Sequence, residues 1–544
     1  MALIFLTLLF KHISYPLIWH DESDTVMFAQ RVVEYGYPKV HADKNVVYGL
    51  RLTQDRRIDT GLDAYTGAPW GYYYFGAIGV ALAAGFDDVY TKTALLRLPF
   101  AAIGAAGLLV LLLGVLDAVS AEPRRRAAFA IAFWSLSAYS VALILHLREA
   151  RYYGLFTFLT CALLAVYLRY HVHRKGTFGA YAALLTLLLF GVFNTFYPAY
   201  PVFLAAMGLH QLGGAVAGRE AAPARRDGFL RGVFPLALSL LLVLPLLFYF
   251  DFLIQVRDWT EAESGSLQRY ASHIDIVLRN LLRYEFLAPA LVARLGVVLL
   301  RALRPARSVS AHELQRRQLS AFLALFIAVY AVIVSTAHVV WDRYFIALSP
   351  VVTVLFLLDA TTLWEWLRDP SFGRRRSARA MAAIVAACFV ASCWIRAPEF
   401  RDRLYEITHP YRGPLDFVIP YLKEKYSKPE DLVIATNYED PVFMYYLGSR
   451  VTVGYYGANL EWDMQYQPDV IVPRPWKRHR RMLRQLAARA EYEHVVFPVK
   501  DQRTNNTPGL SALNPGEVSH RFRTLLAEKG ERKLAILVRP IGSR

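Results

Sequence analysis

Long apolar runs divide the first two thirds of the chain. After a first run at 2–19, they lie at 97–118, 127–146, 152–169, 179–196, 200–217, 232–250, 285–303, 319–339, 345–366 and 380–396. A helix needs about 20 apolar residues to cross the hydrocarbon of a bilayer, and each run is near that length. The pattern predicts a polytopic α-helical membrane protein with about eleven transmembrane helices.

The first run has an unusual composition for a membrane span. It lacks a basic leader and a small-residue cleavage site, so it favours a span over a removable signal peptide. It is short, however, and contains Lys11 and His12. Two explanations stay open: the true start of the protein lies upstream, or this helix faces protein rather than lipid.

Basic loops between the runs predict the topology. These loops are Arg124–Arg126, Arg169–Lys175, Arg225–Arg231, Arg301–Arg317 and Arg374–Arg379. Basic loops stay in the cytoplasm, and all five do so only if a further apolar piece, Gly71–Phe86, does not cross the membrane. We therefore predict a surface-lying or re-entrant helix there, with aromatic residues from Trp70 to Phe75 at the interface. The amino terminus is then inside, and residues 20–94 form a first outer loop.

The composition changes near Pro398 to that of a soluble domain. Segments of strand character alternate with segments of helical spacing, which predicts a C-terminal extracytoplasmic α/β domain at 398–544 behind a transmembrane domain at 1–397. The predicted strands are 431–437, 451–455, 470–472, 494–499 and 534–538, and the predicted helices 413–426, 441–447, 475–490 and 518–529. The tail has no GxGxxG, P-loop or nucleophile elbow, so we assign it no catalysis.

Composition supports the membrane class and limits the partners. The chain of 544 residues is 55% hydrophobic, with a mean hydropathy of +0.28. Its net charge of +17 comes from arginines clustered in loops rather than along one face, so we predict a lipid bilayer and no nucleic acid as partner. Cys161, Cys388 and Cys393 all lie in apolar runs, where small core residues are the simplest interpretation.

An acidic pair, Asp21 and Glu22, follows the first run directly. Acids at a membrane boundary usually mark water, a cation or a catalytic role, although a solvated helix end is an equally ordinary explanation. As chemistry, one carboxylate can remove a proton from an attacking hydroxyl while its neighbour orients that hydroxyl or helps to bind a metal. Asp21 and Glu22 are therefore the candidate catalytic residues.

Two further outer turns carry arginine beside tyrosine. Arg148 and Arg151, three residues apart, are predicted to share one helical face that leads into the next span. With Tyr152 they suit a clamp on a phosphate at headgroup level, or else interfacial anchoring. In the turn 338–344, Arg343 and Tyr344 are candidates for contacting the same phosphate from the opposite wall. The alternative is that Arg343 simply pairs with its neighbour Asp342.

Other polar and aromatic residues on the outer side are weaker candidates. His20, Trp70, Tyr73 and His273 are predicted substrate contacts. His273, in the outer loop 251–284, could join a metal site with an acid of the first loop, but most of that loop has the composition of a solvated face. No cofactor is certain, and a divalent metal ion stays open with unknown ligands.

Taken together, these motifs resemble the GT-C glycosyltransferases, in particular the protein O-mannosyltransferases and the lipid A aminoarabinose transferases. The features are the pair Asp21–Glu22, the Pro-Trp-Gly-Tyr-Tyr-Tyr helix start at 69–74, Leu96–Pro99 and Arg148–Tyr153. The outer α/β tail is similar to tails of bacterial members. One departure is the start of the aromatic helix, which reads Ala68-Pro69-Trp70 rather than Lys-Pro-Pro. A protein acceptor is not favoured, because nothing matches the carboxyl-terminal outer domain of the eukaryotic mannosyltransferases.

The resemblance implies sugar transfer from a polyprenyl-phosphate carrier to an extracytoplasmic acceptor, a lipid, glycan or polysaccharide, by a single inverting displacement. Asp21 matches the acid that acts as base or orients the acceptor. Arg151, with Arg148 and Tyr152, falls where the donor phosphate is held, and Arg343 with Tyr344 matches less closely. The implied location is the inner (plasma) membrane. Two alternatives are a transporter or flippase of lipid-linked sugars and a cell-wall-binding membrane scaffold.

Overall fold

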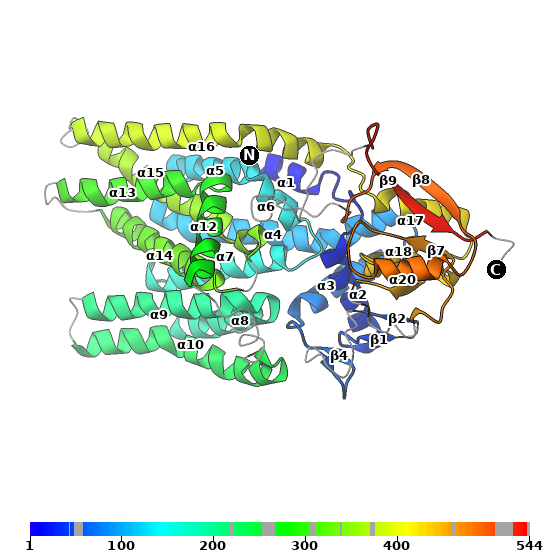
Figure 1. The fold of residues 1–544 in the computed structure, drawn as a ribbon. Helices are drawn as coiled ribbons and strands as arrows, with labels where there is room; N and C mark the ends of the chain where they lie inside the picture. Colours follow the sequence, from blue (N-terminus) through cyan, green and yellow to red (C-terminus); the bar gives the residue numbers. More distant parts are fainter. Residues whose placement is uncertain are drawn as a thin grey trace.

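The computed structural model of the protein describes residues 1–42, 44–47, 58–217, 222–252, 267–303, 310–337, 340–369, 376–455, 457, 463–505 and 526–540. Long helices lie side by side in one half of the molecule, and a mixed sheet with its helices lies at one end of them (Figure 1).

Every predicted apolar run contains helix. The helices of this half are α1 (Ala2–Phe10), α4 (Val89–Val119), α5 (Pro123–Tyr139), α6 (Val141–Leu147), α7 (Tyr153–His171), α8 (Phe178–Phe196), α9 (Tyr200–Ala217), α10 (Ala222–Tyr249), α12 (Leu267–Tyr284), α13 (Leu287–Leu303), α14 (Ala311–Val334), α15 (Leu348–Arg368) and α16 (Arg376–Thr408). Within the described ranges, 7 helical stretches are long and apolar enough to cross a membrane. The protein is a multi-pass membrane protein.

The 7 stretches are fewer than the eleven predicted spans, and each missing span has its own cause in the helix lengths and breaks. Helix α1 ends at Phe10 after 9 residues, and the run 127–146 is broken at Ser140 into α5 and α6. Helix α13 has 17 residues, and α8 and α9 together count as one stretch of 37 residues. The chain leaves the helix after Phe10 and at Ser140, and apolar content alone does not reveal these breaks.

The aromatic piece of the first loop forms α3 (Gly71–Ala83), a helix of 13 residues. At 1.5 Å per residue it is about 20 Å long, which is shorter than the roughly 30 Å hydrocarbon layer. It packs against α2 (His20–Tyr35) and α4. Gly79 permits this approach, since a Cβ atom there would lie 2.8 Å from the main-chain oxygen of Leu96. The length agrees with the prediction that this piece does not span.

The acidic pair begins a helix rather than ending one. Residues 11–19 contain no regular helix, and Asp21 and Glu22 occupy the first turn of α2. Acids are favourable there because the amino-terminal end of a helix carries positive partial charge. The explanation that these acids are the solvated end of the first helix is therefore wrong, because that helix ends at Phe10. Helix α2 ends at Gly36, whose φ of 84° suits a left-handed cap.

The carboxyl-terminal part contains the predicted α/β layer. The strands are β5 (Val433–Thr436), β6 (Arg450–Val453), β7 (Val470–Val472), β8 (Glu493–Lys500) and β9 (Lys533–Val538), with helices α17 (Leu415–Lys425), α18 (Asp440–Leu447) and α20 (Arg480–Ala487). The sheet order is β6-β5-β7-β9-β8. Strands β5, β6 and β7 are parallel, and β9 runs antiparallel to both β7 and β8.

Two boundaries differ from the prediction. Helix α16 continues to Thr408, so the predicted domain boundary at 397–398 falls inside a helix. The predicted helix 518–529 lies outside the described residues except for its last four positions, which are not helical.

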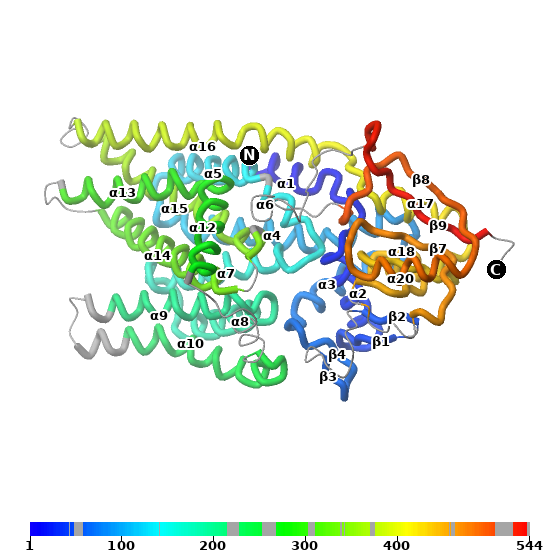
Figure 2. Tube along the Cα trace, viewed as in Figure 1, coloured from blue at the N-terminus to red at the C-terminus, as the bar shows by residue number. Residues whose placement is uncertain are grey.

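The sheet part is docked on the beginning of the chain. The side-chain amide of Asn505 donates to the main-chain oxygen of Leu17 (2.9 Å), and the Leu17 amide donates to Asp416 (3.1 Å). Asn45, in the short hairpin of β1 (His41–Ala42) and β2 (Asn45–Val46), donates to the Ser449 carbonyl at 2.8 Å. Helices α2 and α3 accordingly lie between the long helices and the sheet (Figure 2). A second hairpin, β3 (Ile58–Asp59) with β4 (Ala64–Tyr65), lies beside them.

Candidate functional site

A cavity of about 270 Å³ lies where α2 and α3 meet the ends of the long helices. This volume is close to the lower end of the roughly 300–1,000 Å³ range of small-molecule sites. Its polar and aromatic lining comprises Asp21, Asp24, Tyr65, Tyr72, Tyr73, Arg151, Tyr152, Thr195, Phe196, Tyr197 and Tyr344. The cavity brings together five of the residues predicted from the sequence: Asp21, Tyr73, Arg151, Tyr152 and Tyr344.

Asp21 lies between two arginines. Arg343 Nη2 donates to its Oδ2 at 3.1 Å, and Arg151 Nη1 donates to its main-chain oxygen at 2.9 Å. Burial opposes ionisation of this carboxyl, but the charges of Arg343 and Arg151 outweigh burial and lower its pKa. Asp21 is therefore a carboxylate at neutral pH.

Asp24 is a second acid on the same wall, and it was not predicted. Burial raises its pKa to about 7, against the opposing charges of His20 and Arg151. A carboxyl that titrates near neutral pH suits proton transfer. The signal in the sequence was its position three residues after Asp21, since residues at that spacing share a helical face.

Arg151 is the cationic side of the cavity. Its Nη1 also donates to Thr25 at 2.9 Å, while its Nε is buried and has no hydrogen-bond partner in the described part of the chain. The guanidinium lies 5.6 Å from the ring centres of both Tyr72 and Tyr152. A buried guanidinium with an unused donor is suited to an anion such as a phosphate.

Tyrosines form much of the remaining wall. The hydroxyls of Tyr72 and Tyr73 are 2.6 Å apart, and the ring of Tyr152 stacks on Phe196 at 5.0 Å. Tyr344 lies beside Phe196, with ring centres 5.4 Å apart. Rings with apolar faces and hydroxyl edges suit a sugar, which is likewise part apolar and part hydrogen-bonding.

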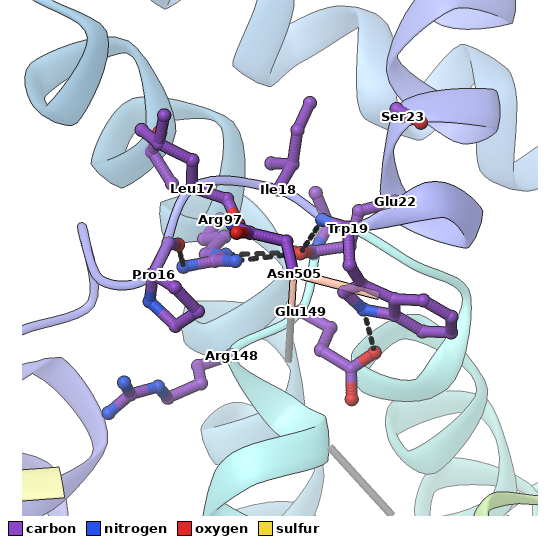
Figure 3. A network of polar contacts seen from close by, with 12 residues as sticks. Pro16, Leu17, Ile18, Trp19, Glu22, Ser23, Arg97, Arg148, Glu149 and Asn505 are labelled. Carbon is purple, nitrogen blue, oxygen red and sulfur yellow. Dashed lines mark hydrogen bonds and ion pairs between the residues drawn. The ribbon is translucent and has the colours of Figure 1, made fainter. Parts of the chain in front are cut away.

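The structure does not bring Glu22 to the cavity. Its carboxylate is 0% exposed and accepts from Arg97 Nε at 2.8 Å and Nη2 at 2.6 Å (Figure 3). The main-chain amides of Ala150 and Trp19 also donate to it, at 2.8 and 3.3 Å. Since both oxygens are engaged in this network, the geometry favours a positioning role for Glu22 over the predicted catalytic one.

Arg148 also points elsewhere. Its guanidinium donates to main-chain oxygens of Lys11, His12 and Tyr15 at 3.1–3.3 Å. The prediction that Arg148 and Arg151 share a helical face is wrong, because α7 begins at Tyr153 and residues 148–152 form turns and bends. Figure 3 shows the Arg148 side chain pointing away from Glu149.

Arg343 reaches the site through Asp21. It belongs to the short helix η2 (Asp342–Phe345), and its guanidinium lies 5.3 Å from the Trp19 ring and 4.6 Å from the Trp341 ring. The alternative of a pair with Asp342 involves a side chain outside the described set. The ion pair with Asp21 joins two segments that are 322 residues apart.

The remaining candidates are dispersed. Trp70 donates its Nε1 to the Tyr65 carbonyl at 2.6 Å and packs against Phe250. His20 lies against the sheet domain, where its ring stacks on Tyr438 at 4.7 Å. His273 is 3.1 Å from the Ser335 carbonyl rather than near an acid of the first loop.

The sequence leaves a divalent metal ion open, with unknown ligands. Among the described residues, no three His, Cys, Asp or Glu side chains gather in a way that could hold a metal ion.

Comparison with known proteins identifies the fold. No protein-family model and no curated protein matches the chain. Among solved structures, it is similar to ArnT from Cupriavidus metallidurans, in the apo state and bound to undecaprenyl phosphate. Identity is 13% in both cases, the TM-scores are 0.50 and 0.51, and the match covers 98% of this chain and 96% of that chain. An Archaeoglobus fulgidus oligosaccharyltransferase in complex with Zn and sulfate matches at 13% identity and a TM-score of 0.48, over 87% of this chain and 67% of that one.

The class defined by this architecture is the GT-C fold, as predicted from the sequence motifs. ArnT is a lipid A aminoarabinose transferase, one of the two groups that the motifs resemble. At 13% identity the likeness describes the fold, and the chemistry has to be argued from the cavity.

Proposed function

We propose that the protein is a membrane glycosyltransferase that moves a sugar from a polyprenyl-phosphate carrier to the hydroxyl of a lipid, glycan or polysaccharide acceptor. The observation that carries this proposal is the cavity in which Asp21, Asp24 and Arg151 meet. It combines an ionised acid, an acid that titrates near neutral pH and a guanidinium with an unused donor. The ArnT structure with undecaprenyl phosphate supports a lipid-phosphate donor for this fold.

The proposed reaction is one inverting displacement. The acceptor hydroxyl gives its proton to Asp24 as its oxygen bonds to the anomeric carbon of the sugar. The bond from that carbon to the phosphate oxygen breaks, and the polyprenyl phosphate leaves with the electron pair. Arg151 stabilises the charge that develops on the leaving phosphate, and Asp21, held by Arg343, orients the acceptor.

The proposed location follows from the loop charges. With the basic loops in the cytoplasm, the cavity and the sheet domain lie on the extracytoplasmic face of the plasma membrane. There the polyprenyl tail stays in lipid while the phosphate and sugar reach the cavity.

Replacement of Asp21 by Asn tests enzyme against flippase. In proteoliposomes of total membrane lipid, supplied with a polyprenyl-phosphate hexose and a polysaccharide extract as acceptors, Asp21→Asn should reduce release of polyprenyl phosphate by about 10²-fold or more because the acceptor is no longer oriented, while undecaprenyl phosphate still binds. If the protein is a flippase, the wild type should release no polyprenyl phosphate, and Asp21→Asn should still translocate the lipid-linked sugar. Comparing glycolipids and polysaccharides by mass spectrometry, in cells with and without the protein, would then identify the sugar and the acceptor.

Replacement of the two predicted arginines separates their roles. Arg151→Gln should weaken binding of undecaprenyl phosphate by about tenfold, since a charge-assisted hydrogen bond to phosphate is lost. Arg148→Gln, whose contacts are with the main chain of residues 11–15, should leave the affinity within about twofold. Titration of both purified proteins with undecaprenyl phosphate measures this, and the reverse order of effects would contradict our assignment.

A further inference from the structure

The three parallel strands of the sheet domain end at a common edge. Strand β5 is followed by Asn437 and Tyr438, β6 by Gly454 and Tyr455, and β7 by the segment 473–478. In open sheets with parallel strands, ligands bind outside the carboxyl ends of those strands.

The strand edge meets the beginning of α2. The His20 ring stacks on Tyr438 at 4.7 Å and lies edge-on to Tyr455 at 5.2 Å. The next residue in the chain is Asp21, the ionised acid of the cavity, and Asp24 lies one helical turn further on. The carboxyl edge of the sheet is thus adjacent to the acids that we assign to catalysis.

Several buried polar atoms at this edge have no partner. His20 is 5% exposed, and neither of its ring nitrogens has a hydrogen-bond partner in the described part of the chain. The indole nitrogen of Trp476 and the Nε of Arg503 are likewise buried without a partner there. Buried polar groups are normally hydrogen-bonded, so unpaired groups from three separate segments indicate a ligand.

The edge combines aromatic rings with guanidinium groups. Arg503 lies 3.4 Å from the Trp476 ring centre and 5.3 Å from that of Tyr438. Arg478 lies 5.1 Å from the Tyr455 ring, and its side chain is exposed. Rings suit the apolar face of a sugar, and guanidinium groups suit phosphate or carboxylate.

A buried network fixes this edge to the start of the chain. Glu439 and Arg474 form an ion pair of 3.0 Å in which both side chains are fully buried. The Asn505 amide donates to Glu439 at 2.7 Å, and its side chain donates to the Leu17 carbonyl at 2.9 Å. Because Leu17 lies four residues before Asp21, the network sets the position of the edge relative to the cavity.

We propose that the strand edge formed by His20, Tyr438, Tyr455, Trp476, Arg478 and Arg503 is the acceptor subsite, and that it binds a sugar carrying a phosphate or another anionic group. This inference rests on the proposed function, since it assigns the acceptor of the same reaction. It gives the sheet domain a role, which is to present the acceptor hydroxyl to Asp21 and Asp24.

The test is equilibrium binding without a donor. Full-length protein in nanodiscs is titrated calorimetrically with glucose 1-phosphate and with glucose. Wild type should bind glucose 1-phosphate at least about fivefold more tightly than glucose, and Arg478→Gln should weaken glucose 1-phosphate about tenfold. Arg478 is exposed, so its replacement should not disturb folding.

Arg484→Gln is the matched control. Arg484 is an exposed arginine on α20 that lines a separate basic hollow with Arg480 and Arg532. Its replacement should leave the affinity unchanged. The proposal is overturned if wild type does not bind glucose 1-phosphate, if glucose binds equally well, or if Arg484→Gln rather than Arg478→Gln weakens binding. Because no donor is present, these binding results do not depend on sugar transfer, so failure of the subsite and failure of the proposed function are measured separately.

Discussion

Asp24→Asn should lower sugar transfer by about 10²- to 10⁴-fold, the usual contribution of a positioned general base. Burial raises the pKa of Asp24 to about 7, and a base must be deprotonated to act. We therefore expect the wild-type rate to rise as the pH passes through about 7, and this rise to be absent from the residual activity of the variant. Release of polyprenyl phosphate from a polyprenyl-phosphate hexose, measured from pH 5 to 9 with membrane lipids and polysaccharide as acceptors, tests both.

The same substitution should make the protein more stable at high pH. The folded-state pKa of Asp24 is raised above its unfolded value, so the contribution of this group is fully favourable below about 4 and is lost as the pH rises through about 7. Asn cannot ionise, and removal of the buried charge should add up to about 4 kcal/mol of stability at pH 8 and almost none at pH 4. Thermal unfolding at the two pH values measures the difference.

Asp87→Asn is the matched control for Asp24. Asp87 is exposed in the loop after α3 and is not part of the cavity lining. Its replacement should change neither the rate nor the pH profile. If Asp24→Asn retained the wild-type rate, or if its residual rate still rose near pH 7, another group would be the base.

Glu22→Gln should destabilise the protein by about 3–5 kcal/mol, the cost of leaving a buried charge unpaired. Arg97 is 4% exposed and would lose its ionised partner in a region with little access to water. The effect should appear as a lower unfolding temperature in detergent or nanodiscs. In the surviving folded fraction, transfer should persist, because the Glu22 carboxylate does not line the cavity.

Two further variants test this explanation. Glu34→Gln, near the other end of α2, removes an acid whose side chain is 37% exposed and paired with Arg31 at 3.2 Å. Its cost should be below about 1 kcal/mol, as for other exposed pairs. Combining Glu22→Gln with Arg97→Met should recover part of the lost stability. A fully stable Glu22→Gln protein without transfer activity would instead restore the catalytic role.

The C-terminal sheet illustrates how well local patterns predict structure. All five predicted strands are present, from Val433–Thr436 to Lys533–Val538. Each is a short apolar segment between turn residues. Such segments can be predicted as strands without knowing which strands they pair with. Local patterns do not predict the docking of this sheet on Leu17 and Asn45, because its contacts join residues about 400 positions apart.

The sequence predicts only part of the candidate site, because contacts between distant segments decide which side chains are buried and paired. Asp21 and Arg151 stood out as charges beside apolar runs. Asp24 is equally acidic in the sequence, and only burial against α3 and the sheet domain distinguishes it. In the sequence Glu22 is equivalent to Asp21, but Arg97 from α4 and the main-chain amides of Trp19 and Ala150 engage both of its oxygens.

By itself the sequence determined the membrane class, the short aromatic helix within the first loop and the α/β tail, because hydrophobic period and length are local properties. The tertiary structure decided which acids share a cavity with Arg151, which acid titrates near neutral pH, and where the sheet domain lies. Those properties depend on burial and on charge pairs such as Arg343 with Asp21, which form only when distant segments fold together.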